Sequence, residues 1–170
     1  PKLADLDLPS SVVFDENDVW YFSDQANQII RYVENGVINT IAGVPKTAGY
    51  ADGPGAAAMF NGSVSQSAPP TSRIDYADGY LYVADSGNHV IRRFAVGTWA
   101  PAGELTGHTN TVLSGAFSPD GSTVYTGSDE TVIAWDRRAN RKRDEWKRDG
   151  RVLHLAVSAD GRTLFETTPA

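Results

Sequence analysis

Histidine, serine and aspartate side chains are the candidates for chemistry in this sequence. The chain has three histidines, His89, His108 and His154, and no cysteine. A catalytic zinc would need three such ligands to converge. No Gly-x-Ser-x-Gly nucleophile elbow is present, and the glycines around Pro54 lack the Lys-Ser/Thr pair of a phosphate-binding loop. We therefore predict no catalytic site, no bound cofactor and no metal; the chain is not expected to be an enzyme.

Charge and hydropathy restrict the classes of partner. The net charge of −6 disfavours unspecific binding to nucleic acid. No apolar run is long enough to span a membrane, and no signal peptide is recognisable. Eight Arg and Lys residues crowd into residues 137–151. They fit the solvated face of an outer strand, with a phosphate-binding patch as the alternative. We expect a soluble protein with neither a nucleic-acid nor a membrane partner, in a compartment that the sequence does not identify.

The elements that would position these residues are strands. Apolar residues alternate with polar ones and are interrupted by Asp-Gly pairs such as Asp78-Gly79, which predicts β-hairpins. Tyr82, Tyr125 and Leu164 hold corresponding places, 43 and 39 residues apart. Four-stranded units that recur at this period are typical of β-propellers.

We therefore predict an all-β propeller fragment of about four blades, built from antiparallel four-stranded sheets. The blades are placed at residues 9–43, 72–107, 111–150 and 152–170. The last is only half complete, and residues 2–8 could supply an outer strand for it. Residues 44–71, which are rich in Gly, Pro, Ala and Ser, are predicted to form a long loop that adds no strand.

Two stretches of the first half repeat each other. WYFSDQANQIIR at residues 20–31 matches LYVADSGNHVIR at residues 81–92. This pattern resembles the NHL repeat over about residues 9–97. The resemblance marks six turn and core residues: Asp24, Asn27, Ile30, Asp85, Asn88 and Ile91. The aspartates and asparagines would cap a turn, and the isoleucines would face the neighbouring sheet. Because an NHL-type propeller can carry a zinc-dependent lyase site, a zinc enzyme stays open as a third function.

The second half has a different pattern. Gly107-His108, FSPDG at residues 117–121, Thr126 to Asp129 and Trp135-Asp136 resemble a WD repeat over about residues 105–165. That family has a buried hydrogen-bond network. Carried over to this chain, the network would comprise His108, Thr126 or Ser128, Asp129 and Trp135. Asp129→Ala is then expected to cost about 1–3 kcal/mol.

The two resemblances divide one propeller domain into residues 1–97 and 98–170. We interpret the chain as a chimera: an engineered hybrid scaffold without evolved catalytic activity, which folds and self-associates to close a ring. Two chains joined head to tail would give an eight-blade homodimer. The alternative is a natural propeller-type module for protein–protein interaction, with a protein or peptide partner.

Overall fold

The turns of the chain account for its hairpins. In the computed structural model, which describes residues 5–55, 57–62 and 73–169, two-residue loops at Asn35-Gly36 and Asp78-Gly79 have positive φ at both positions. This conformation matches the twist of an antiparallel pair and is open to Asn, Asp and Gly at low cost. These sequence signals therefore act locally, before any contact between sheets.

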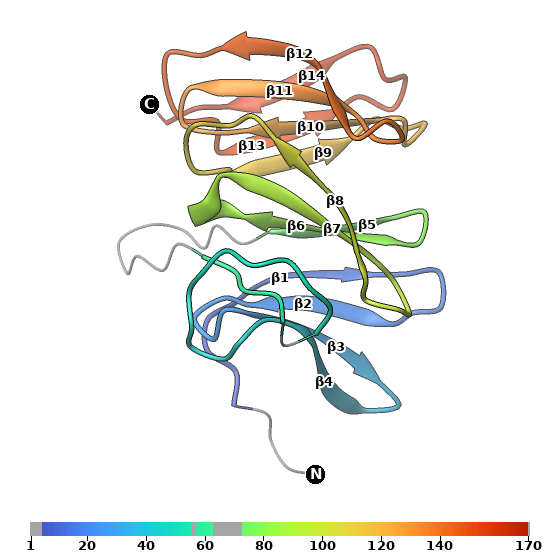
Figure 1. Cartoon of the computed structure of the whole chain (residues 1–170). Coiled ribbons are helices and arrows are strands. Elements are labelled where there is room, and N and C mark those ends of the chain that lie inside the picture. Colours follow the sequence, from blue (N-terminus) through green and yellow to red (C-terminus); the bar gives the residue numbers. More distant parts are fainter. Residues whose placement is uncertain (1–4, 56, 63–72, 170) are drawn as a thin grey trace.

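In the described part of the chain, fourteen strands form three four-stranded antiparallel sheets and one hairpin, here called blades one to four (Figure 1). Blade one comprises β1 (Pro9–Phe14), β2 (Trp20–Asp24), β3 (Ile29–Glu34) and β4 (Val37–Ala42). Blade two comprises β5 (Ile74–Ala77), β6 (Tyr80–Asp85), β7 (Val90–Ala95) and β8 (Pro101–Thr106), with a single 3-10 turn at Ser86–Asn88. Blade three comprises β9 (Ser114–Phe117), β10 (Thr123–Gly127), β11 (Thr131–Asp136) and β12 (Arg141–Lys147). Blade four comprises β13 (His154–Val157) and β14 (Leu164–Thr167).

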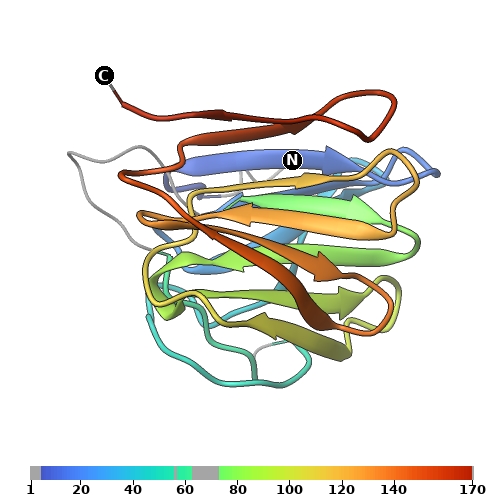
Figure 2. The same cartoon turned by 90° about the horizontal axis from the view of Figure 1, so that it is seen from above.

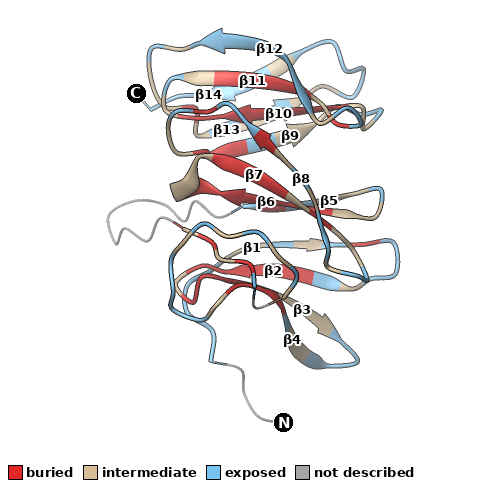
Figure 3. Cartoon of the chain, viewed as in Figure 1, coloured by how far each residue is buried: buried red, intermediate tan, exposed pale blue. Residues whose placement is uncertain are grey.

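The blades stack face to face in chain order, with blade one and blade four at opposite ends of the arc (Figures 1 and 2). Buried residues concentrate on the strands of blades one to three (Figure 3). One apolar cluster joins blades one and two and contains Tyr21, Ile30 and Leu81. A second joins blades two and three and contains Tyr82, Ile91 and Trp135. The prediction of an all-β propeller fragment of about four blades, the last one half complete, is confirmed.

The register of blade four corrects one equivalence. Phe165 pairs with Ala156, as Tyr125 pairs with Ala116. Phe165 therefore corresponds to Tyr125, and Leu164, which was predicted to do so, lies on the opposite face of its strand. The error arose because Leu164 follows the Asp-Gly turn at nearly the spacing seen in blade two.

The segment before blade one does not complete blade four. Gln25 N donates to Leu8 O at 3.3 Å, and Ala26 N donates to Asp7 O at 3.0 Å. Residues 5–8 thus lie along the β2–β3 turn of blade one, and no strand is assigned to them. Within one chain, residues 5–8 therefore supply no outer strand for blade four.

The segment after β4 packs without forming a strand. Over residues 44–55 and 57–62 its only bridges are isolated, at Ala42–Gly55, Ala48–Phe60 and Ala51–Met59. Phe60 is buried in the cluster between blades one and two. Residues 63–71 of the predicted loop lie outside the described residues. The described part of the segment therefore contributes side chains to the apolar cluster between blades one and two.

Candidate functional site

A buried polar network joins the strands of blade three. Thr126 Oγ1 lies 2.6 Å from His108 Nε2 and accepts a hydrogen bond from Trp135 Nε1 at 2.7 Å. His108 Nδ1 lies 3.1 Å from Thr131 Oγ1, which lies 2.9 Å from Ser128 Oγ. The network therefore links the loop between β8 and β9, which carries His108, to β10 and β11.

Asp129 lies outside this network. Its carboxylate pairs with Arg151 Nε at 2.8 Å, and its side chain is 36% exposed. Thr131 occupies the place that the family pattern assigned to the turn aspartate. A hydroxyl can both donate and accept, so it satisfies His108 without burying a charge. The sequence did not indicate Thr131, because the carried-over pattern gave the role of turn residue to Asp129.

Burial controls the protonation of His108. Desolvation lowers the pKa of its imidazole to about 4; the charge of Glu145 acts against this shift, and those of Lys142 and His89 act with it. The histidine is therefore neutral at pH 7, with one ring nitrogen able to accept and the other to donate. This protonation state fits a structural role in the network.

The two aspartates of the repeated pattern build the same cluster twice. Asp24 accepts from Asn27 Nδ2 at 3.0 Å and pairs with Arg31 Nε at 2.8 Å. Asp85 accepts from Asn88 Nδ2 at 2.9 Å. It also lies 3.5 Å from Arg92 Nη1. Both carboxylates are fully buried.

Each cluster also holds a passing segment of chain. Asp24 Oδ1 accepts from Asp7 N at 2.8 Å, and Asp85 Oδ1 accepts from Asn61 N at 2.7 Å. Arg31 donates to Asp5 O and Arg92 to Met59 O, two residues earlier in each case. Residues 5–7 therefore occupy the same place on blade one as residues 59–61 occupy on blade two. Both clusters have a structural role, since their polar groups form hydrogen bonds with the backbone of these passing segments.

The isoleucines of the pattern face the neighbouring blade. Ile30 lies in the cluster between blades one and two, and Ile91 in the cluster between blades two and three.

The histidines lie in three different environments. His89 follows the 3-10 turn with φ 62°, His108 is in the network, and His154 is exposed on β13. His154 Nδ1 lies 3.5 Å from Arg73 Nη2. Among the described residues, no group of three or more His, Asp or Glu side chains is arranged to hold a metal ion.

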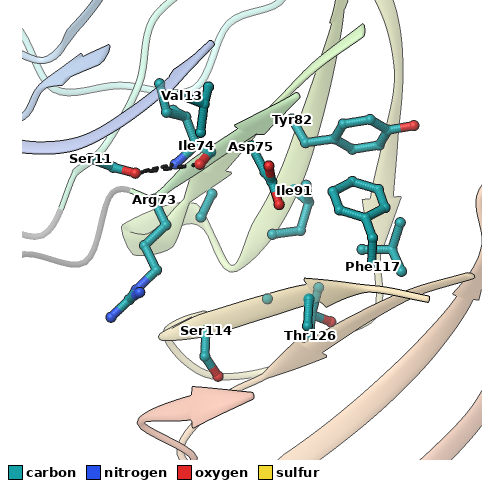
Figure 4. Close-up of a pocket in the computed structure, with 14 residues that line it drawn as sticks. Ser11, Val13, Arg73, Ile74, Asp75, Tyr82, Ile91, Ser114, Phe117 and Thr126 are labelled. Carbon is teal, nitrogen blue, oxygen red and sulfur yellow. Dashed lines mark hydrogen bonds between the residues drawn. The ribbon is translucent and has the colours of Figure 1, made fainter. Parts of the chain in front are cut away.

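The two complete interfaces between blades differ in packing. A hollow of about 10 Å³ lies between blades one and two. A hollow of about 230 Å³ opens beside the inner strands (Figure 4). Blades two and three form most of its lining, and Ser11 and Val13 of blade one also line it. We call it the seam hollow; its lining includes Asp75, Tyr82, Ile91, Gly115 and Phe117.

One face of blade one is apolar and open. Val12 and Trp20 are 53% and 51% exposed on the side away from blade two, and Phe14 lies beside Trp20 with ring centroids 5.3 Å apart. The pairing of Val12 with Phe22 and of Ile74 with Val83 makes Val12 the counterpart of Ile74. We call the side chains of Val12, Phe14 and Trp20 the leading face.

The opposite end of the arc also presents an open face. Phe165 is 58% exposed on blade four, whereas its counterparts Tyr21 and Tyr82 are 2% and 4% exposed against the following blade. We call the side of blade four that carries Phe165 and Ala156 the trailing face.

The two ends of the arc differ in charge. Residues 5–42 contain seven acidic side chains and one arginine, a net charge of −6. Residues 137–167 contain nine basic and five acidic side chains, a net charge of +4. β12 is exposed along its whole length, and Arg148 and Arg151 pair with Glu166 and Asp129. Apart from Arg137, which is buried and pairs with Asp78, the basic segment is therefore an outer strand with its turns. Within the described residues, no helix has the length and hydropathy of a membrane span.

Comparisons with known proteins agree with this geometry. Residues 99–136 match the family model "WD domain, G-beta repeat". "Protein LST8 homolog" of Dictyostelium discoideum is 37% identical over 71 residues, which are 40% of this chain and 23% of that protein. The chain therefore spans under a quarter of this curated relative.

Hydrazine synthase from Kuenenia stuttgartiensis has a similar structure, with a TM-score of 0.69 over 98% of this chain and 44% of that chain. At 15% sequence identity, the likeness concerns the fold alone. The match at residues 99–136 covers the part of the chain that holds His108, Thr126, Thr131 and Trp135. The chain thus contains a WD repeat within a propeller-like all-β fold.

Proposed function

We propose that this chain is a propeller module for protein–protein interaction that closes its ring with a second copy of itself. The leading face of each copy would pack on the trailing face of the other. In this proposal the first two blades are of the NHL type and the last two of the WD type. The module has no catalytic activity of its own.

The observation that carries the proposal is the exposure of the leading face. Ile74 and Leu81, the counterparts of Val12 and Trp20, are 5% and 0% exposed because blade one covers them. The same positions on blade one are half exposed. A face with the pattern of a blade interface, left in water, favours another blade as its occupant.

The trailing face supplies the complementary half. In blades one and two an aromatic ring at the position of Phe165 is buried against the next blade. A second copy would place its leading face there. Such a heterologous contact closes without free ends when a two-fold axis relates two four-blade arcs, which gives eight blades.

Charge favours a second copy over an unrelated partner. The leading end carries −6 and the segment beside the trailing face carries +4. Head-to-tail contact would bring the opposite charges together twice in one dimer, and like charges would face each other in any other arrangement of the ends. The contact should therefore weaken as salt screens the charges.

A sedimentation velocity series tests this proposal with a matched pair of variants. Trp20→Ser removes the largest side chain of the leading face. Val37→Ser removes an apolar side chain that is 57% exposed on the other face of the same blade. We expect Trp20→Ser to raise the dissociation constant of the dimer at least about tenfold, and Val37→Ser to leave it unchanged. Equal effects of the two variants would contradict the assignment of the leading face.

The hybrid and engineered origin is a separate part of the proposal, supported by the two repeat patterns that meet within blade two. Discovery of the whole sequence in a genome would contradict it. The second candidate, a natural interaction module, is favoured by the WD repeat at residues 99–136, since WD repeats mostly serve as rigid binding platforms. A monomer that captures a protein partner would favour that candidate.

A further inference from the structure

The seam hollow differs from the first interface at two positions. Val13 and Asp75 are counterparts, because they pair with Tyr21 and Tyr82. Val13 packs on the cluster between blades one and two, whereas Asp75 points toward blade three (Figure 4). An acid thus stands where the first interface has an apolar side chain.

The second difference lies on blade three. Gly115 pairs with Thr126 as Ile74 pairs with Val83, so Gly115 is the counterpart of Ile74. Ile74 is buried in the first interface, but Gly115 has no side chain to fill the second. Neither Asp75 nor Gly115 thus places an apolar side chain in this space. A cavity of about 150 Å³ already admits a molecule as large as benzene.

Asp75 has no cation beside it. None of the ion pairs found among the described residues includes it, and its side chain accepts a hydrogen bond from the N–H of Tyr76 at 2.8 Å. The guanidinium of Arg73 points away from it (Figure 4), toward His154. Asp75 is open to water on the side of the inner strands, while dehydration by the surrounding protein raises the pKa of its carboxyl group.

Two aromatic rings line the same hollow as this carboxylate. Tyr82 and Phe117 meet edge to face with their centroids 5.1 Å apart, and both line the hollow (Figure 4). Ile91 and Val124 add apolar walls. A carboxylate next to aromatic faces is suited to a positive charge on an apolar stem, because charge pairing and cation–π attraction act together.

We propose that the seam hollow binds a small organic ammonium ion, with its charge on Asp75 and its stem between Ile91, Phe117 and Val124. The site lies within one chain and does not depend on the dimer. A free alkylamine and the side chain of a peptide lysine share this chemistry, and the experiment has one arm for each.

The experiment is a titration followed by NMR chemical shifts and calorimetry. The probes are n-butylammonium chloride, a short peptide with a single central lysine, and n-butanol as the neutral control. The variants are Asp75→Asn, which removes the charge, and Gly115→Ile, which fills the hollow. Asp18→Asn, a change in the β1–β2 turn, is the matched control for loss of one negative charge.

We expect saturable binding of butylammonium but not of butanol, with shifts confined to the lining residues. Asp75→Asn should weaken binding at least about tenfold, Gly115→Ile should abolish it, and Asp18→Asn should leave it unchanged. If the peptide binds as well as butylammonium, the site is assigned to protein lysines. If butylammonium binds and the peptide does not, the site is assigned to free amines. Failure of butylammonium to saturate, or equal affinity for parent and Asp75→Asn, would overturn the proposal.

Discussion

The interface between blades one and two and that between blades two and three have the same architecture and different contents. In the first, Ile74 is buried in the apolar cluster and Val13 packs against it, and both side chains also border the hollow. In the second, their counterparts Asp75 and Gly115 leave a hollow of about 230 Å³. Two blades can therefore stack in the proper order without close packing, because the remaining apolar contacts between them hold them together. Specificity of fold and completeness of packing are separate properties in this chain.

The largest expected effect comes from opening the tight interface. Ile74→Ala should lower the free energy of unfolding by about 3 kcal/mol, because it removes buried methylene groups and leaves a cavity. Urea denaturation followed by circular dichroism measures the change. Val37→Ala, at an exposed apolar site of the neighbouring blade, should change the stability by less than about 0.5 kcal/mol. A small effect of Ile74→Ala would mean that the first interface is no better packed than the second.

Acid should distinguish blade three from blades one and two. Since the pKa of His108 is lowered from 6.5 to about 4, the unfolded chain binds a proton between these pH values and the folded chain does not. Stability from this residue is thus complete above pH 6.5 and falls as the pH falls toward 4, by at most about 3 kcal/mol.

Urea denaturation at intervals from pH 7 to pH 4 tests this expectation on the parent and on His108→Gln. The variant should lack this part of the pH dependence, while the carboxylates of blades one and two titrate alike in both proteins. Parallel curves for the two proteins would contradict a buried neutral histidine.

Filling the seam hollow should make the second interface resemble the first. Gly115→Ile is expected to raise the free energy of unfolding by about 1 kcal/mol through apolar burial and a less flexible unfolded chain. A Cβ at this position would have as its nearest neighbour the carbonyl oxygen of Tyr125 at 3.5 Å. Gly127→Ala is the control, since a Cβ there would lie 2.6 Å from Ser114 Oγ, and it should destabilise. Thermal melting of both variants decides the matter, and destabilisation by Gly115→Ile would contradict the equivalence with Ile74.

The smallest effect is expected at Asp129. Its ion pair with Arg151 is partly exposed, so Asp129→Ala should change the stability by no more than about 0.5 kcal/mol. Thr126→Val, which removes the hydroxyl shared by His108 and Trp135, should cost about 1–3 kcal/mol. Equal losses of stability for the two variants would indicate that Asp129 belongs to the network after all.

The fold could be predicted because its signals are local. Asp78-Gly79 and the other Asp-Gly turn pairs specify hairpins. The repeat of residues 20–31 at residues 81–92 specifies a second blade. Contacts that depend on distant parts of the chain were harder. Residues 5–8 were assigned to the wrong blade, because the capture of the Asp7 N–H by Asp24 is visible only in three dimensions.

The candidate sites show the same limit. Thr126 and Trp135 follow from the family pattern, but the exchange of Asp129 for Thr131 depends on which side chain reaches His108. The seam hollow was not predicted at all, since Asp75 and Gly115 acquire meaning only when the strand register makes them counterparts of Val13 and Ile74.

The molar mass in solution tests the central claim most directly. Light scattering coupled to size exclusion at low ionic strength should give about twice the chain mass of 18.3 kDa, and the value should fall toward one chain mass on dilution or at high salt. A mass near 18.3 kDa at every concentration and ionic strength would contradict the claim that the leading and trailing faces cover each other.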